Sequence, residues 1–299
     1  MFNFTPSNVK HVACGVAALM LVASPVALAQ DANDAPAEDA GATDAVAPPA
    51  NDSEARGETP EAQKGYDIAA RADRTDLGFG DSKVDAEMVL RNSAGQETRR
   101  SLSFSTLEKV DETVGDKSLV IFNSPRDVEG TALLSHAKIL DPDDQWLFLP
   151  ALKRVKRISS ANKSGSFVGS EFAFEDFTLT ELNKFTYKYI GEDEIDGLKT
   201  DVIERFPRYE KSGYTRQKSW IDQEIFQPRK LEFYDRKGAL LKTLTISDYR
   251  DYDGVWRAHR LTMVNHQSNK ETDLVYDVYE FGAGLDANDF NQAVLTRLR

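Results

Sequence analysis

The residues best suited to bind a ligand are four basic side chains within five positions. They surround Val155 and comprise Lys153, Arg154, Lys156 and Arg157. Alternation along a strand places Arg154 and Lys156 on one face and Arg157 on the other, so basic groups stand on both faces. Guanidinium and ammonium groups bind phosphates and carboxylates. The cluster therefore predicts contact with an anionic headgroup or a partner's carboxylate, with a solvated, aggregation-resistant edge strand as the alternative.

The remaining candidate groups do not form a recognisable catalytic or metal site. Beyond the amino-terminal segment the histidines are His136, His259 and His266. The last two are seven positions apart in a predicted strand, which directs them to opposite faces. The sequence contains no His-Glu-x-x-His helix, nucleophile elbow or phosphate-binding glycine loop. We therefore expect neither an enzyme nor a bound metal or other cofactor.

Carboxylates give no stronger signal for chemistry. Asp248, Asp251 and Asp253 precede Gly254, but their spacing does not match a calcium loop, and Asp253-Gly254 indicates a hairpin turn. Pairs such as Glu171 with Glu175 are solvated charges unless a cleft perturbs them.

An aromatic segment follows the basic cluster. Phe167, Phe172, Phe174 and Phe177 lie close together, with Gly169 among them. This composition suits a movable apolar flap, and it suits equally a loop that plugs the end of a barrel.

Strands with one apolar face must position these segments. Val84, Met88 and Leu90 alternate with charged residues, and similar period-two runs recur along the chain. Turn signals separate them at 93–95, 196–197, 236–238 and 253–254. Because the spacings are too short for parallel crossovers, we expect about ten strands in an antiparallel meander.

Few helices are available to cover this sheet. The sequence predicts an amphipathic helix over 60–76, a second helix near 172–183, and a third over 290–299 that Asp286 to Asp289 could cap. The sheet can therefore curl so that its apolar face lines an interior, which either packs solid or holds a ligand. The residues predicted to line an apolar, lipid-binding cavity are Phe104, Phe122, Trp146, Phe148, Val155, Ile158, Phe167, Phe172, Phe174, Phe177, Trp220 and Phe233.

The chain is expected to consist of a signal peptide over 1–29, a disordered acidic leader over 30–59 and one domain over 60–299. The apolar run at the amino end contains Pro25 and closes in Ala27-Leu28-Ala29, which favours cleavage over an uncleaved anchor. Cleavage would remove Cys14, the one cysteine. The net charge of −12 falls largely on the leader, and no basic surface suggests nucleic acid. We expect an exported, periplasmic protein.

The run from Trp146 to Asp176 resembles the outer-membrane lipoprotein-sorting protein family. The resemblance includes the motif Leu149-Pro150-Ala151-Leu152 with the basic residues that follow, and the segment from Gly65 to Asp81. It implies a mainly β fold like LolA and LolB, with a curved antiparallel sheet in an incomplete, half-open β-barrel and a helical lid.

The resemblance also implies a function. It suggests a periplasmic carrier that takes the acyl chains of a lipoprotein or lipid toward the outer membrane, beside an inner-membrane transporter of the resistance-nodulation-division type. A monomer is expected. The alternative is a structural or adaptor protein that docks onto such a transporter and carries nothing.

Overall fold

The computed structural model describes residues 55–109, 114–139, 141–177 and 181–298. The predicted signal peptide lies outside these residues, as does the predicted leader except for its last five positions. The described residues belong to one compact unit. The three domain boundaries remain predictions.

Within the described ranges the chain forms one antiparallel sheet of fourteen strands. The strands are β1 (Asp81–Arg91), β2 (Glu97–Leu107), β3 (Val114–Ser124), β4 (Ala132–Lys138), β5 (Asp144–Leu149), β6 (Arg154–Arg157), β7 (Phe185–Ile195), β8 (Leu198–Pro207), β9 (Arg216–Asp222), β10 (Pro228–Tyr234), β11 (Leu240–Tyr252), β12 (Val255–Asn265), β13 (Lys270–Tyr276) and β14 (Glu280–Phe281). This confirms the predicted antiparallel meander, with more strands than expected.

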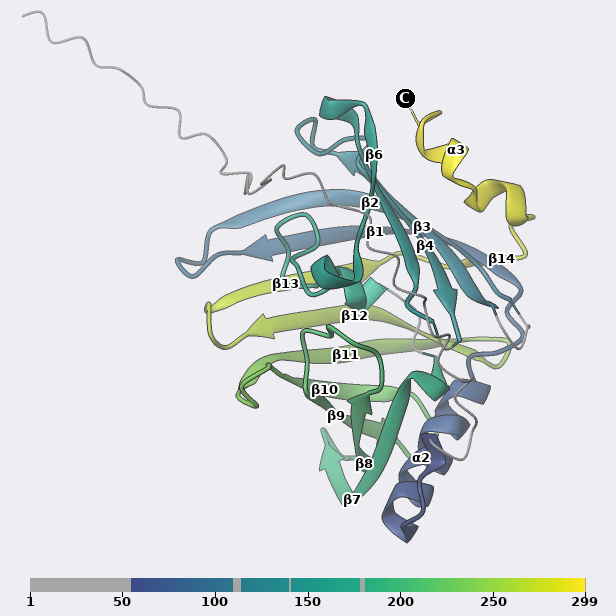
Figure 1. Ribbon diagram of the computed structural model, residues 1–299, viewed down its shortest axis with the longest axis vertical. Helices are drawn as coiled ribbons and strands as arrows, with labels where there is room; N and C mark the ends of the chain where they lie inside the picture. The colour runs from purple at the N-terminus through teal and green to yellow at the C-terminus, as the bar shows by residue number, and fades with distance from the viewer. Residues whose placement is uncertain (1–54, 110–113, 140, 178–180, 299) are drawn as a thin grey trace, which may run out of the picture. The chain divides into compact units, whose positions relative to one another are not determined.

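The sheet consists of two meanders joined in the middle. Its order is β6-β5-β4-β3-β2-β1-β13-β12-β11-β10-β9-β8-β7, and β14 pairs with β1. Strands β1 and β13 pair from Ala86 opposite Tyr276 to Arg91 opposite Glu271. The outer strands β6 and β7 do not pair with each other in the described part of the chain, so the curved sheet stays open (Figure 1). The incomplete barrel that the sequence predicted is confirmed.

The predicted turns join neighbouring strands. Asp196 and Gly197 connect β7 to β8, and Asp253 and Gly254 connect β11 to β12, with φ between 52° and 95° at all four residues. Positive φ at both central positions matches the right-handed twist of a hairpin, and Asp-Gly adopts it readily. The segments 93–95 and 236–238 form the turns between β1 and β2 and between β10 and β11.

The first predicted helix is confirmed. Helix α2 (Pro60–Arg74) begins with Pro60 in its first turn, and the hydroxyl of Thr59 accepts a hydrogen bond of 3.1 Å from the backbone N–H of Ala62. Tyr66 and Ala70 are buried in a cluster with Phe185 and Tyr187 of β7 and Ile203 of β8. The helix lies beside these two strands in Figure 1. No helix within the described residues is long and apolar enough to cross a bilayer.

The second predicted helix is wrong. Its described residues form two 3-10 turns, η3 (Phe174–Phe177) and η4 (Leu182–Lys184). The backbone before η3 instead folds back on itself, with a bridge between Ser166 and Ala173. The aromatic side chains there pack into the core without a helical period, so burial overrides local helix preference.

The third predicted helix is confirmed in a shorter form. The turn η5 (Ala287–Phe290) carries a capping box made by Asp286 and Asp289, and α3 (Gln292–Leu295) follows.

The sheet carries apolar clusters on both faces. Val120, Leu133 and Leu147 belong to the core on the concave face. Their immediate neighbours along the strands point the other way. Leu134 and Trp146 therefore lie on the convex face, where they pack with residues of the carboxyl-terminal segment that include Phe290 and Leu295.

Candidate functional site

A segment that we call the strap, residues 159–177, leaves strand β6 and crosses the concave face of the sheet (Figure 1). Polar contacts attach it to both meanders. Nη1 of Arg100 on β2 donates a hydrogen bond of 2.5 Å to the carbonyl of Val168. The backbone N–H of Glu171 donates to the hydroxyl of Thr272 on β13 at 3.0 Å. The strap is therefore fixed against the middle of the sheet.

The aromatic side chains of the strap fill the concave face beneath it. Phe167 is fully buried, with its ring centroid 5.5 Å from that of Phe122 and 4.3 Å from that of Phe177. Phe172 and Phe174 are also buried in this cluster. This burial favours the predicted plug over the movable flap, although the segment lies over the middle of the sheet and not at its end.

A cavity of about 550 Å³ lies between the strap, helix α2 and the concave face of the sheet. Strands β1, β2 and β13 on one side and β7 to β12 on the other contribute to its wall. Most of the sheet residues that line it are apolar, and they include Val84, Phe104, Leu231, Phe233, Leu244, Ile246, Leu261 and Tyr276. The volume falls within the range of roughly 300–1,000 Å³ typical of small-molecule sites.

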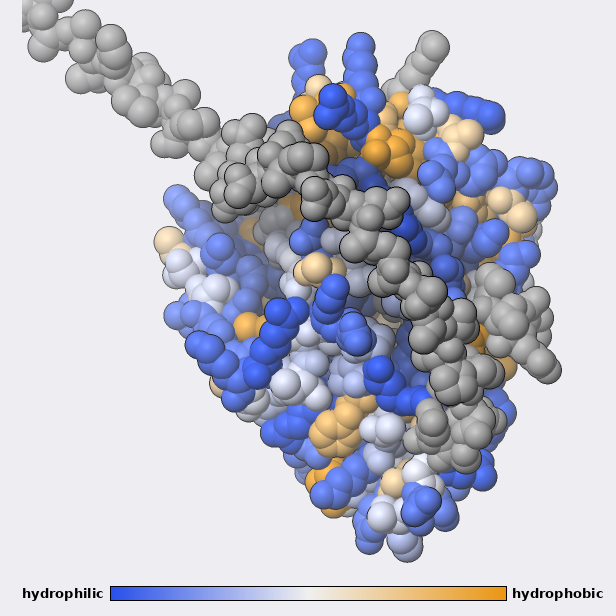
Figure 2. Space-filling model, viewed as in Figure 1, coloured by the Kyte–Doolittle hydropathy of each residue, from blue (hydrophilic) through white to orange (hydrophobic). Residues whose placement is uncertain are grey.

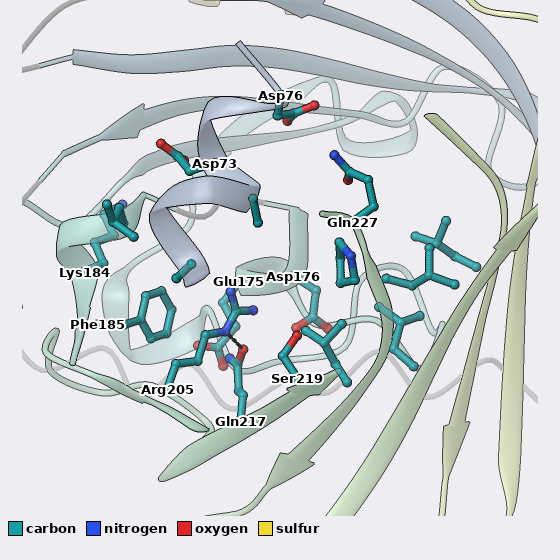
Figure 3. Close-up of a pocket in the computed structure, with 18 of the residues that line it drawn as sticks. Asp73, Asp76, Glu175, Asp176, Lys184, Phe185, Arg205, Gln217, Ser219 and Gln227 are labelled. Carbon is teal, nitrogen blue, oxygen red and sulfur yellow. Dashed lines mark hydrogen bonds between the residues drawn. The ribbon is translucent and has the colours of Figure 1, made fainter. Parts of the chain in front are cut away.

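The end of the cavity at β8 and β9 is polar. Arg205, Gln217 and Ser219 project from these strands into it (Figure 3). Nε of Arg205 donates a hydrogen bond of 2.7 Å to Oε1 of Gln217, its cross-strand neighbour. The guanidinium carbon lies 4.8 Å from the centre of the Phe185 ring. Burial lowers the pKa of Arg205 from its ordinary value, which still leaves an arginine charged at neutral pH.

Two carboxylates near this end connect the strap to the segment between β8 and β9. Glu175 accepts hydrogen bonds from the backbone N–H of Gly213 at 2.9 Å and from the hydroxyl of Ser212 at 2.9 Å. Asp176 accepts from the hydroxyl of Tyr214 at 2.8 Å and forms an ion pair of 2.7 Å with Lys242. Burial raises the pKa of Glu175 and its hydrogen bonds oppose this shift.

The end of the cavity at α2 is acidic. Asp73 and Asp76 project from α2 and the residues that follow it (Figure 3). Asp76 pairs with Arg257. Nearby, burial raises the pKa of Asp116 to about 6 and that of Glu181 to about 7, with neighbouring carboxylates adding to both shifts.

The structure brings only part of the predicted lipid-binding set to the cavity. Phe104, Phe172 and Phe233 line it. Five more pack in the adjoining concave core without lining the cavity: Phe122, Ile158, Phe167, Phe174 and Phe177.

The other four predicted residues point away from the cavity. Trp146, Phe148 and Val155 lie on the convex face in the cluster with Phe290. Trp220 lies on the opposite face of β9 from Gln217 and Ser219, and its indole N–H donates to Asp193 at 2.9 Å. The prediction that these four line the cavity is corrected, because the convex face is also apolar here and alternation does not distinguish the faces.

The predicted headgroup cluster lies at an edge of the sheet. Among the described residues, strand β6 pairs only with β5, opposite Trp146 to Leu149. Lys153, Arg154, Lys156 and Arg157 are exposed there and are not among the residues that line the cavity. Hydrophobic residues accompany them at the top of Figure 2, and the side chain of Leu152 is among the exposed ones, at 59%. Arg157 pairs with Asp144.

Sequence reasoning missed the polar groups of the cavity. Alternation within the strand predicts that Arg205 faces solvent, because Val202 and Phe206 indicate that the opposite face is the apolar one. The structure places Ile203 and Arg205 toward the cavity and Val202 opposite Trp220 on the other side. The polar residues Gln217 and Ser219, which alternate along the next strand, are the signal that could have indicated a polar inner face beside Arg205.

Comparisons with known proteins agree with this architecture. A family model with the description "-like: Uncharacterized protein" matches residues 115–297. A domain classed with the outer membrane lipoprotein-sorting proteins, from Vibrio parahaemolyticus, is 48% identical with a TM-score of 0.76, over 79% of this chain and 100% of that one. A search of curated proteins found no match.

Two further solved structures are similar. A DUF1329 family protein from Desulfovibrio piger is 28% identical with a TM-score of 0.75, over 79% of this chain and 100% of the other. A LolA superfamily protein from Nitrosomonas europaea, 22% identical with a TM-score of 0.62 over the same shares, has the same fold. The fold is thus the one seen in that LolA superfamily protein, and the chain belongs to the family of outer membrane lipoprotein-sorting proteins.

Proposed function

We propose that this protein is a periplasmic carrier that binds the acyl chains of a lipid or lipoprotein in its cavity and moves them toward the outer membrane. The observation that supports it most directly is the cavity of about 550 Å³ beneath α2 and beside the strap. An apolar sheet face that its own side chains leave partly unfilled gains free energy when a hydrocarbon chain covers it, at about 0.8 kcal/mol for each buried methylene.

The proposal includes the predicted setting. It comprises export by a cleaved signal peptide, action as a monomer and cooperation with an inner-membrane transporter of the resistance-nodulation-division type, as the sequence and the family resemblance suggest. Apolar contacts discriminate weakly between hydrocarbon chains, so the chain-binding part of the site should accept several lengths.

An uptake measurement tests the carrier function. Delipidated protein is titrated with a fluorescent fatty acid, and saturable binding is expected. Ser219→Phe places a ring in the cavity and should weaken binding at least about tenfold. Thr245→Phe adds the same ring on β11 at an exposed position that does not line the cavity, and binding should persist.

Two results would contradict the proposal: no saturable uptake by the wild-type protein, or equal losses in both variants. Native mass spectrometry of protein purified from cells adds a second readout, because a carrier should retain hydrophobic small molecules. A purely docking protein would carry none. The exposed basic strand β6 with Leu152 is the surface that such an adaptor would use.

A further inference from the structure

The guanidinium of Arg205 is a cation in the cavity that lacks a carboxylate partner. Among the residues that the structure describes, its polar contact is the single hydrogen bond from Nε to Gln217, and it takes part in no ion pair. An arginine carries five N–H donors, so four remain for another acceptor. Arg205 is half-buried in the cavity wall, and its remaining N–H donors make an incoming anion favourable at this position.

Nearby carboxylates are already engaged by other donors. Asp176 forms an ion pair with Lys242 and accepts a hydrogen bond from the hydroxyl of Tyr214. Glu175 accepts hydrogen bonds from the backbone N–H of Gly213 and the hydroxyl of Ser212. The strap and the segment after β8 thus use these acidic groups to hold themselves together. Arg205 forms no ion pair with them in the described part of the chain, although Asp176 is near enough to favour its charged form.

Apolar wall continues directly from this polar end. Gln217 pairs with Phe233 across β9 and β10, and Ser219 pairs with Leu231. Leu231 in turn pairs with Leu244 on β11. A ligand with its polar group at Arg205 would therefore lay its chain over successive apolar strands.

The opposite end of the cavity supports one orientation. Asp73 and Asp76 lie at the end formed by α2, and only Asp76 has a basic partner, Arg257, within the described residues (Figure 3). Asp73 therefore disfavours an anionic group at that end. Beside Arg205 the two carboxylates, Glu175 and Asp176, already accept from other donors, and four N–H donors of Arg205 remain for a ligand.

We propose that Arg205, with Gln217 and Ser219, binds the anionic headgroup of an amphiphile, a carboxylate or a phosphate, whose chain lies over Leu231, Phe233 and Leu244. This inference rests on the proposed carrier function and names the class of ligand. It also moves headgroup recognition from the basic edge strand to the interior of the cavity. Arginine suits both anions, since its planar fork donates two parallel hydrogen bonds.

Calorimetric titration with ligands of one chain length tests the assignment. Dodecanoate, dodecyl phosphate and neutral dodecanol are added below their aggregation concentrations to delipidated wild-type protein. At least one anion should bind more tightly than the alcohol, and the stronger anion identifies the headgroup chemistry. Arg205→Met should weaken that anion about 10- to 100-fold and leave dodecanol nearly unchanged.

A second variant keeps the arginine. Gln217→Glu places a carboxylate next to Arg205 and should reduce anion binding similarly, because the internal ion pair competes with the ligand. It also provides the test if Arg205→Met fails to fold. Arg154→Met in the exposed basic cluster is the matched control, and anion affinity should stay at the wild-type value.

The outcomes separate the two proposals. If dodecanol and the anions all bind but Arg205→Met and Gln217→Glu leave anion affinity unchanged, the Arg205 site is wrong and the carrier function stands. An equal loss for anion and alcohol also overturns the headgroup assignment. If neither class binds the wild-type protein, the carrier function itself fails.

Discussion

The side chain of Lys242 joins the strap to β11 through buried contacts. Nζ lies 2.7 Å from Oδ2 of Asp176 and donates to the carbonyl of Glu171 at 3.1 Å. The side chains of Lys242 and Asp176 are only 4% and 8% exposed. Removal of one partner of such a pair leaves a buried charge without compensation, which costs more than the intact pair contributes.

We therefore expect Lys242→Met to lower the free energy of unfolding by about 3–5 kcal/mol, measured by urea denaturation. The double variant Lys242→Met with Asp176→Leu should recover much of this loss, because no isolated charge remains. Arg250→Met removes an exposed pair with Asp248 and should change little. Equal losses for the buried and exposed pairs would contradict the role given to burial.

The raised pKa of Glu181 makes the free energy of unfolding depend on pH. Burial, together with Asp116, Asp73 and Asp143, raises the pKa of Glu181 to about 7, while Lys184 opposes the shift. A carboxyl group with a raised pKa keeps its proton in the folded protein where the unfolded chain has lost it. Its effect on stability therefore becomes unfavourable as pH rises from about 4.5 to about 7.

Glu181→Gln should accordingly raise the free energy of unfolding at pH 8, by on the order of 1–3 kcal/mol, and by less at pH 5. Denaturation curves at the two pH values measure the difference. Glu224→Gln makes the same change in net charge at an exposed position and serves as the control. A gain that is the same at both pH values would show that ionisation of Glu181 is not its cause.

Helix α2 can lie close to β7, and so cover its side of the cavity, because Gly65 has no side chain. A Cβ at Gly65 would lie 2.9 Å from the backbone carbon of Lys188 and 2.9 Å from the backbone nitrogen of Tyr189, both on β7. Contacts under 3.0 Å with backbone require the helix to move. The close approach lets Tyr66 and Ala70 pack on β7 and β8.

Gly65→Ala should destabilise the protein by about 1–3 kcal/mol although alanine favours helix, because overpacking outweighs helix propensity here. Amide exchange in α2 should accelerate, which reports loosening of this side of the cavity. Gln63→Ala introduces alanine at an exposed position of the same helix, with a smaller gain in propensity, and should not destabilise. A more stable Gly65→Ala variant would refute the packing argument.

Across the whole domain, the cavity connects the two meanders. Its wall includes Val84 and Phe104 from the first meander and Leu231 and Leu244 from the second. A ligand that fills the cavity contacts both and binds only the folded state. Ligand binding and global stability are therefore linked.

A bound acyl ligand should raise the melting temperature of the delipidated protein. At a free concentration one hundred times its dissociation constant, the gain is about 2.7 kcal/mol. Scanning calorimetry with increasing dodecanoate measures it, and Ser219→Phe should show a much smaller rise. A ligand-independent melting temperature would mean that the cavity is not the binding site.

Local patterns predicted most of the elements, although not the 3-10 turns that replace the helix expected near 172–183. Period-two alternation and the Asp-Gly turns predicted the antiparallel meander, Pro60 predicted the start of α2, and Asp286 predicted the cap of the last helical segment. These features depend on backbone geometry over a few residues, so they can be read without knowledge of the rest of the chain. The motif around Leu149 to Ile158 further indicated the family.

Only the tertiary structure decided which face of each strand meets the cavity. The carboxyl-terminal segment covers the convex face of β4 and β5, so Trp146 and Leu147 are both buried although they point in opposite directions. Arg205 looks like an ordinary outward residue until β9 places Gln217 beside it. The sequence by itself therefore determined the strands, turns and family, while long-range pairing and the cover on each face determined the site, because these involve residues far apart in the chain.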